Sequence, residues 1–426
     1  MPLSRHFYSL DEVQSSLYYT SSRSQSNETL FWCQELLLSG CIGETISTLF
    51  ESWIWNTGPF HLNWLLHASK TLSSSELSID DILLSAYQLS SSTSRDHSLW
   101  NILVHHIKDP TIPDRVTRKS PPQFPSNDPK EIYFIRSIFQ GKTQSAYWIS
   151  HYIHSEQVWY LLKWYYTELC AEYSTYYKEC FEIFQNYERL LGYRSDSYDK
   201  VMLCLAIMSV CLSNNNKKNS FQSLPLELSP SSSIFLKELS PHIGYSTYRK
   251  YTIPILCLYG TTSRGCSQWS QNNKNQLYQV ENYLLGCPFW EEEIVEYGRI
   301  IEKEKEIKEI KEIKEIEWES EEKMEEFYEK YFQDDIPDEW TKQEKDKSHG
   351  DGVLGPRDQI NLYHYSKKYL SKRSRMAWNK IKSTQKYLEQ HTISECHPTA
   401  IFSLPSLLPP LIESILLPVH KKFIFI

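Results

Sequence analysis

Glycine is scarce in this chain, which contains only 13 glycines in 426 residues. Glycine provides the left-handed backbone of tight hairpin turns and the close backbone approach of phosphate-binding loops. This low content therefore disfavours β-rich architectures with many tight turns and glycine-rich nucleotide-binding folds. The chain is still long enough to form two or three domains of ordinary size with a sizeable core.

The chain also lacks the motifs that define common catalytic sites. It contains no G-x-S-x-G and no H-E-x-x-H, and Arg136 stands where a phosphate-binding loop ending in Gly141-Lys142-Thr143 needs its first glycine. His105 and His106 are adjacent, so on a helix they point about 100° apart and are poor joint metal ligands. We therefore predict no cofactor and no metal site. An enzyme stays open only as a protein whose active site is dispersed along the chain.

The ten cysteines include no C-x-x-C pair, which argues against a zinc ribbon and a thioredoxin-like site. Most of them lie in apolar runs, where a free thiol behaves as a small hydrophobic group, and this usage fits a reducing compartment. The N-terminus has no apolar run of the kind that a signal peptide needs. Residues 401–419 are apolar, but four prolines and Glu413 argue against a transmembrane helix there.

Apolar residues recur at helical spacing through the first hundred residues, with polar turns between the runs. Ser78 and Asp81 form a capping-box pattern, which predicts a helix start. The predicted helices cover residues 11–19, 28–38, 43–56, 61–71, the stretch after Ser78, and 96–108. Six prolines within residues 109–129 then block helix formation and predict a linker or an extended strap.

The most regular apolar pattern lies between Ala146 and Leu191. Nine residues there follow one another in steps of three or four: Leu162, Tyr166, Leu169, Tyr173, Tyr177, Cys180, Phe184, Tyr187 and Leu191. The spacing places them on one stripe of a long helix. Few Lys or Arg flank the rings, which favours a core role over stacking on nucleic acid bases. Residues 201–212 are apolar all round and should form the most buried helix.

A low-complexity tract of Lys, Glu and Ile covers residues 301–316, and its isoleucines from Ile307 to Ile316 are three residues apart. Steps of three spread these side chains over about half of the helix circumference, so a coiled-coil seam is not supported. We interpret the tract as a solvated helix held by Glu–Lys pairs or as an expanded surface loop.

Two charged segments near the C-terminus are the candidate recognition sites. An acidic cluster could dock a partner, with helix capping as the simpler interpretation: Asp334, Asp335, Asp338, Glu339 and Trp340. Within residues 363–386, basic residues set among aromatics could neutralise phosphates and stack on bases: Lys367, Lys368, Lys372, Arg373, Arg375, Lys380 and Lys382. The alternative for this basic segment is a helix that packs its aromatics inward and pairs its charges with the acidic region.

Four blocks of sequence occur in order along the chain: MPLSRHFYSLDEV at the N-terminus, LFWCQELLLSG at 30–40, RKYTIP at 249–254 with the TTSRG that follows, and FYEKYFQDDIPDEWTKQEKDKSHG at 327–350. Together they resemble an uncharacterised family of nucleocytoplasmic large DNA viruses. The resemblance implies a viral protein that acts with other viral proteins in the host cytoplasm, a viral factory or the virion. It implies no catalytic residues, and the Lys-Glu-Ile tract looks like an insertion particular to this chain.

A shorter stretch carries a second, local resemblance. Residues 28–37, with Ile42 and residues 46–49, are similar to the helical collar region of clamp-loader-type and RarA-type ATPases. The chain has no Walker motifs, so this resemblance implies a scaffold without its motor.

These patterns predict a mainly α-helical fold, built as a short-helix bundle or as solenoid-like blocks with an irregular, charged C-terminal third. The predicted divisions are 1–108, 109–129, 130–212, 213–300, 301–326 and 327–426. We expect a non-enzymatic interaction or scaffold protein of a large DNA virus, in an assembly or replication complex. The alternative is a nucleic-acid-associated replication factor on a collar-like helical scaffold.

Overall fold

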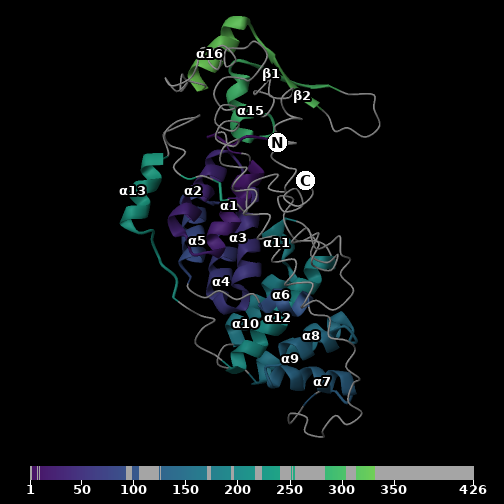
Figure 1. The fold of residues 1–426 in the computed structure, drawn as a ribbon. Coiled ribbons are helices and arrows are strands. Elements are labelled where there is room, and N and C mark those ends of the chain that lie inside the picture. The colour runs from purple at the N-terminus through teal and green to yellow at the C-terminus, as the bar shows by residue number, and fades with distance from the viewer. Residues whose placement is uncertain are drawn as a thin grey trace, which may run out of the picture.

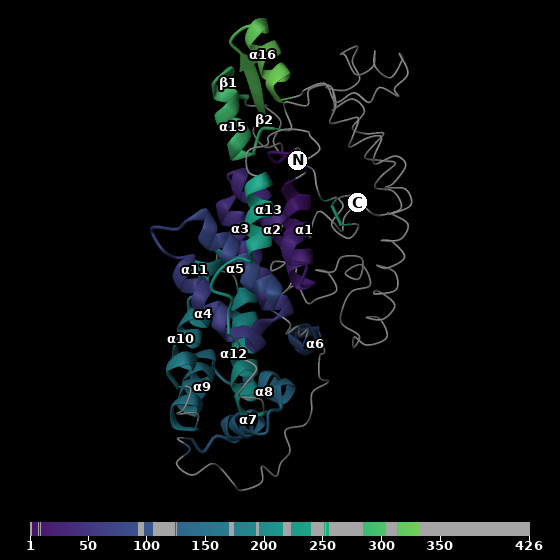
Figure 2. The same ribbon diagram turned by 90° about the vertical axis from the view of Figure 1, so that its left-hand side faces the viewer.

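The computed structural model describes residues 2–6, 8, 10–92, 98–104, 124, 126–169, 174–192, 196–215, 223–239, 251, 253–254, 284–303 and 313–331. These residues form a mainly α-helical protein, as the sequence predicts. The described part is elongated in both views, with a small helix-and-hairpin unit at one end and α7 near the other (Figures 1 and 2). Within these ranges, none of the helices combines the length and the apolar character that crossing a bilayer requires.

The helices before the proline-rich segment follow the predicted spacing. They are α1 (Leu10–Ser22), α2 (Ser26–Leu38), α3 (Ile42–Asn56), η1 (Gly58–His61), α4 (Leu62–Thr71), α5 (Ile79–Ser91) and α6 (Ser98–Val104). The predicted capping box is present at the start of α5, where the Asp81 backbone N–H donates to Ser78 Oγ at 3.1 Å. The predicted flanks of α6 lie outside the described residues.

A second group of helices follows the proline-rich segment. They are α7 (Pro129–Phe139), α8 (Thr143–Ser150), α9 (Ser155–Leu169), α10 (Ser174–Gln185), α11 (Glu188–Leu191), α12 (Asp196–Asn215) and α13 (Pro230–Leu239). Most of the proline-rich segment lies outside the described residues. Phe124, within it, packs edge-on against Trp164 of α9, with ring centroids 5.3 Å apart.

The nine-residue aromatic stripe is buried, but it does not form one helix. Its described side chains are all buried: Leu162, Tyr166, Tyr177, Cys180, Phe184, Tyr187 and Leu191. Tyr166 and Phe181 stack with ring centroids 4.8 Å apart, whereas a continuous helix would separate them by about 22 Å. The chain therefore reverses between α9 and α10, and the prediction of a single long helix is wrong. The helical period continues through the reversal, so the spacing gave no signal of it.

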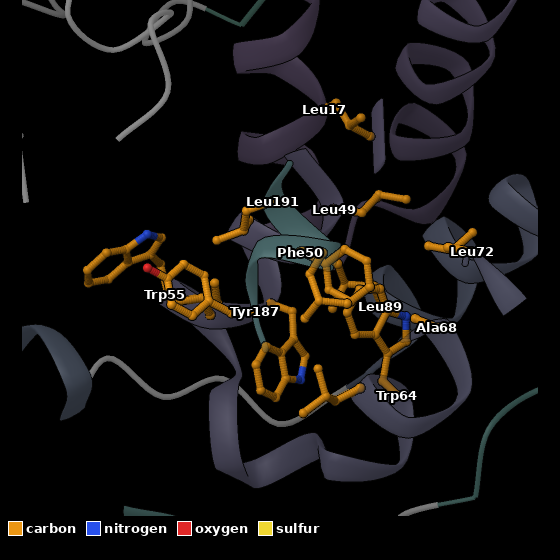
Figure 3. Packing of buried hydrophobic residues seen from close by; sticks show 14 of the residues in the cluster. Leu17, Leu49, Phe50, Trp55, Trp64, Ala68, Leu72, Leu89, Tyr187 and Leu191 are labelled. Carbon is orange, nitrogen blue, oxygen red and sulfur yellow. The ribbon is translucent and has the colours of Figure 1, made fainter. Parts of the chain in front are cut away.

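Helix α12 is enclosed on all sides, as its apolar sequence predicts. Every residue from Val201 to Cys211 except Leu203 is buried. Figure 3 shows a neighbouring part of the same core, where side chains from α1, α3, α4 and α5 lie together with Tyr187, just before α11, and Leu191 at its end. Phe50 and Trp64 meet there with ring centroids 5.3 Å apart.

The two helical blocks share this core. Helix α12 contacts η1 and α6 from the first block and α7 to α10 from the second, while α11 packs on α3 and α10 packs on α4. Tyr198 of α12 also donates a buried hydrogen bond to Glu51 of α3, at 2.9 Å. The composition change at 109–129 therefore does not separate two cores.

A small unit follows, built from α15 (Pro288–Val295), an antiparallel hairpin of β1 (Gly298–Lys303) and β2 (Ile313–Trp318), and α16 (Glu321–Tyr331). Its core is aromatic: the Trp290 and Tyr331 rings lie 5.2 Å apart, and the Tyr297 and Phe327 rings 5.4 Å apart. The unit stands beyond the α1–α5 layer in both views (Figures 1 and 2).

Both described ends of the Lys-Glu-Ile tract are strands, so the helix interpretation is wrong for them. Ile300 pairs with Ile316 across the hairpin, and both side chains pack against the aromatic core of this unit. Alternate residues of a strand share one face, so the hairpin can cover its isoleucines where a solvated helix could not. The loop interpretation concerns residues 304–312, which lie outside the described residues.

The shared core predicts that one substitution in α12 loosens both blocks. Leu205 is buried and packs against Gly58 of η1. Leu205→Ala should lower the free energy of unfolding by about 2–5 kcal/mol through lost burial and a residual cavity. Hydrogen–deuterium exchange should then accelerate in both α3 and α8. The exposed Lys200→Ala on the same helix serves as the control, and acceleration confined to α8 would contradict a shared core.

Candidate functional site

The predicted recognition residues all lie outside the described residues, which end at Tyr331. This applies to the acidic cluster at 334–340 and to the basic segment at 363–386, and also to His105 and His106. Gly141-Lys142-Thr143 is described and joins α7 to α8. A phosphate-binding loop needs a preceding strand, so this helix-to-helix turn agrees with the rejection of that motif from sequence.

A buried polar cluster lies where the N-terminal segment crosses α2. We call Ser4, His6, Glu35 and Ser39 the Glu35 cluster. Ser4 Oγ and the His6 backbone N–H donate to Glu35 Oε1 at 2.5 and 2.9 Å, and His6 Nδ1 lies 2.5 Å from Glu35 Oε2. The Arg5 backbone N–H donates to Ser39 Oγ at 2.9 Å. The cluster therefore fastens residues 2–8 to α2.

Ser, His and Glu are also the components of a nucleophilic triad, but the connectivity here differs. A triad links them in series, with the imidazole between the hydroxyl and the carboxylate. In this structure the Ser4 and His6 side chains both bond to Glu35, each on a different oxygen, and Ser4 Oγ donates its proton to the carboxylate. The His6 imidazole bonds to Glu35 and does not stand between the carboxylate and the Ser4 hydroxyl, so the geometry supports anchoring and not the serial arrangement of a triad.

The electrostatics agree with an anchoring role. Burial alone would raise the pKa of Glu35, but attraction to the His6 ring and hydrogen bonds from His6 and Ser4 outweigh it, so the pKa lies below its usual 4.5. Burial also lowers the pKa of Arg5, an effect that the Glu35 and Glu293 carboxylates partly oppose. A buried carboxylate without such donors would cost several kcal/mol, so Glu35 holds the N-terminal segment in place.

The same cluster also contacts the helix-and-hairpin unit. Trp290 of α15 donates from its indole Nε1 to the Ser4 carbonyl at 2.9 Å, and the Phe289 N–H donates to the Ser39 carbonyl at 3.3 Å. Gly40, at φ +80°, lies so close to Pro288 that an added Cβ would stand 2.7 Å from the proline ring. The unit is thus seated on residues 2–8 and the turn between α2 and α3.

Two cysteines lie where the unit contacts the turn after α2, and both thiols are unreactive. The thiols of Cys41 and Cys287 both donate to the Ser39 carbonyl, at 3.8 and 3.4 Å. Burial, followed by their mutual influence for Cys41, raises the pKa of Cys41 to about 12, and burial raises that of Cys287 to about 11. Thiols with such pKa values stay protonated near neutral pH and are poor nucleophiles.

Two concave features are formed by described residues, and the first is aromatic. A groove of 350 Å³ runs between α9 and α10, which we call the aromatic groove. It is lined mainly by Glu156, Trp159, Tyr160, Lys163, Tyr166 and Phe181. Trp159 and Phe181 meet edge-on at 5.9 Å, while Tyr160 leaves half of its surface exposed. Sequence reasoning missed Tyr160, although its place two positions before Leu162 puts it about 200° around the helix from the buried stripe.

The second feature is a larger groove of 520 Å³ between α4 and the α10–α11 region. Its walls mix charges of both signs, including Lys70, Glu179, Glu182 and Arg189, over a few apolar side chains. The Lys70–Glu179 ion pair bridges the walls at 3.0 Å with both side chains exposed. Exposed pairs of this kind contribute little, and the mixed charge gives the groove no clear preference for a ligand class.

No three His, Cys, Asp or Glu side chains in the described part of the chain come close enough together to hold a metal ion. The described helices make this a mainly α-helical protein. No protein-family model, curated protein or solved structure matches the chain.

The Glu35 cluster predicts a specific loss of stability in acid. Because the pKa of Glu35 is depressed in the folded protein, its contribution is complete above the unfolded-state value near 4.5 and is lost as the pH falls through the lower folded value. Glu35→Gln should lower the free energy of unfolding by about 1.5–3 kcal/mol at neutral pH, the usual range for a charged hydrogen bond.

Denaturant titrations from neutral pH to below pH 4 measure this, with the exposed Glu44→Gln as the control. The difference between wild type and Glu35→Gln should begin to shrink below about pH 4.5, where the Glu35 carboxylate of the unfolded chain becomes protonated, and should be lost as the pH falls through the lower folded-state pKa. A difference that stays constant with pH would contradict the assignment of a charged Glu35.

Proposed function

We propose that this chain is a non-enzymatic interaction protein, and that it binds an extended, proline-containing segment of a partner protein in the aromatic groove. The observation that carries the proposal is the groove itself, in which Trp159, Tyr160, Tyr166 and Phe181 line one concave surface. Aromatic-lined grooves suit polyproline-II segments, which are already extended and lose little conformational entropy on binding.

The packing of the rings in the aromatic groove suits the binding of such a segment. Tyr166 and Phe181 are buried and stack on one another at 4.8 Å, so they form a firm floor. Tyr160 rises from the rim with half of its surface exposed, and it can supply both an apolar ring and a hydroxyl to a bound segment. Glu156 and Lys163 stand at the same rim and can select the charge of residues that flank a proline.

One residue of the proline-rich segment already packs on the same helix. Phe124 lies in the proline-rich segment and places its ring against Trp164 of α9 at 5.3 Å. Trp164 and Tyr160 are four residues apart, so they share one stripe of the helix. The surface of α9 is thus suited to a phenylalanine beside prolines, and the aromatic groove extends that surface by one turn.

The sequence blocks that resemble a family of large DNA viruses support the expectation that the partner is another viral protein, in an assembly or replication complex. The same resemblance favours the host cytoplasm, a viral factory or the virion as its location. The alternative function, a nucleic-acid-associated replication factor on a clamp-loader-collar-like scaffold, is supported by the basic and aromatic residues of 363–386.

A labelled peptide with the sequence of residues 119–128 is a suitable probe, because it contains the phenylalanine flanked by prolines. Fluorescence anisotropy should show saturable binding to the full chain. Tyr160→Ala should weaken that binding about fivefold, since an aromatic contact contributes about 1 kcal/mol. Co-purification from cells that make the other viral proteins should lose a stoichiometric partner in the same variant.

Tyr176→Ala is the matched control, because Tyr176 is 51% exposed against 50% for Tyr160 and does not line the groove. It should bind the peptide and the partner as the wild type does. Absence of peptide binding, or equal binding by the Tyr160 and Tyr176 variants, would overturn the proposal. Salt-sensitive nucleic acid binding abolished by Ala at Lys372, Arg373 and Arg375, without any peptide binding, would favour the alternative.

A further inference from the structure

Three aromatic side chains that do not line the aromatic groove form a ladder on the α7–α8 hairpin. Tyr133 of α7 meets Trp148 of α8 edge-on, with ring centroids 6.3 Å apart. Trp148 in turn meets Tyr152, which follows α8, at 5.2 Å. We call these three residues the ring ladder. It draws on two helices, so the spacing of neither helix alone reveals it.

The hairpin supports the ladder rigidly. Gly141, at φ +66°, turns the chain so that α7 and α8 pack against each other. The opposite sides of both helices are buried at 0% exposure, through Phe134 and Ile135 on α7 and Ala146 on α8, and both helices contact α12. The rings therefore stand on a part of the molecule that is anchored in the core.

The three rings of the ladder differ in how much of their surface is exposed. Tyr152 is 44% exposed, and Tyr133 and Trp148 are half-buried. The Tyr152 N–H donates to the Ile149 carbonyl at 3.0 Å, which continues the helical turn and holds the ring near Trp148. Bases of single-stranded nucleic acid stack on exposed aromatic rings, and Tyr152 offers such a ring next to Trp148.

The hairpin is also basic in a chain whose net charge is −8. Lys130, Arg136 and Lys142 all lie on it, and its one acidic residue, Glu131, is only 9% exposed. Asp128, just before α7, is engaged as the helix cap and accepts the Lys130 backbone N–H at 2.8 Å. The exposed charge of the hairpin itself is thus mainly positive, which complements a phosphate backbone.

We propose that the α7–α8 hairpin binds single-stranded nucleic acid, with bases stacked on the ring ladder and phosphates held by Lys130, Arg136 and Lys142. Single strands fit because their bases are free to stack on exposed rings, whereas the bases of a duplex are already paired and stacked. This site uses none of the residues of the basic segment at 363–386 and none of those that line the aromatic groove, and it adds a second class of ligand to the same protein.

The test uses the full chain and a fluorescein-labelled oligothymidylate, with a duplex of equal length for comparison. To remove any contribution from the C-terminal basic segment, all measurements are made with Lys372, Arg373 and Arg375 replaced by Ala. In this background the single strand should bind more tightly than the duplex. Tyr152→Ala should weaken binding by at least about fivefold, the lower end of what stacking on one base contributes.

Two further variants separate stacking from charge. Lys130→Gln with Lys142→Gln should reduce the slope of log affinity against log salt by about 1.4, or about 0.7 for each phosphate contact. Trp148→Phe keeps a ring, so it should bind nearly as well as the parent while losing the quenching of tryptophan fluorescence that a stacked base causes. Tyr176→Ala, which removes from α10 a tyrosine at least as exposed as Tyr152, should behave as the parent does.

Circular dichroism and thermal melting of each variant establish that a loss of binding does not reflect a loss of fold. No binding of oligothymidylate at low salt in this background would overturn the proposal. Binding that Tyr152→Ala leaves unchanged would overturn it equally, even if the lysine variants had an effect. Peptide binding at the aromatic groove is unaffected by either result, so the two proposals fail separately.

Discussion

The structure depends on one constraint: α12 is apolar around its whole circumference and must be enclosed on every side. An apolar helix left in water would lose roughly 1.5–3 kcal/mol for each large side chain that stayed exposed. One layer of helices cannot surround it, so helices from both sides of the proline-rich segment contribute. The merging of the two blocks into one core follows from this requirement, as does the antiparallel return of α10 beside α9, which places Phe184 and Cys180 in that core.

Much of the helical layout could be predicted from sequence, because it depends on local spacing. The apolar recurrences located α1 to α5 to within a few residues, and Ser78 with Asp81 marked a helix start correctly. The reversal after α9 could not be predicted, because the stripe keeps its period on both sides of it. The hairpin at 298–318 was also missed, since isoleucines three apart fit neither a narrow helical face nor strict alternation.

The Glu35 cluster and the ring ladder could not be predicted from the sequence for a different reason. Ser4 and His6 lie 31 and 29 residues from Glu35, and Trp290 lies 286 residues from Ser4, so only folding brings them together. The ring ladder likewise joins residues of two helices. The residues singled out from local charge patterns, at 334–340 and 363–386, all lie outside the described part of the chain. Local composition points to charged segments, whereas the surfaces that the fold assembles combine side chains from separate elements.

The aromatic residues in the described part of the chain thus divide into two populations with different roles. One population is buried, in the helical core or in the small unit next to the Glu35 cluster, and stabilises the fold. A few on α8 and α9 stay at the surface beside charged side chains, where they can meet a partner. The Glu35 cluster also has a structural role. Its buried carboxylate holds the N-terminal segment in place, and this segment in turn contacts the unit that contains α15 and α16.

Hydroxyl-radical footprinting of the full chain, resolved to single residues by mass spectrometry, tests this division most directly. Tyr187 and Tyr198 are 1% and 0% exposed, whereas Tyr152 and Tyr160 are 44% and 50% exposed. The account predicts rapid oxidation of Tyr152 and Tyr160 and strong protection of Tyr187 and Tyr198. Comparable oxidation of all four tyrosines, or protection of Tyr152 and Tyr160 in the isolated protein, would contradict it.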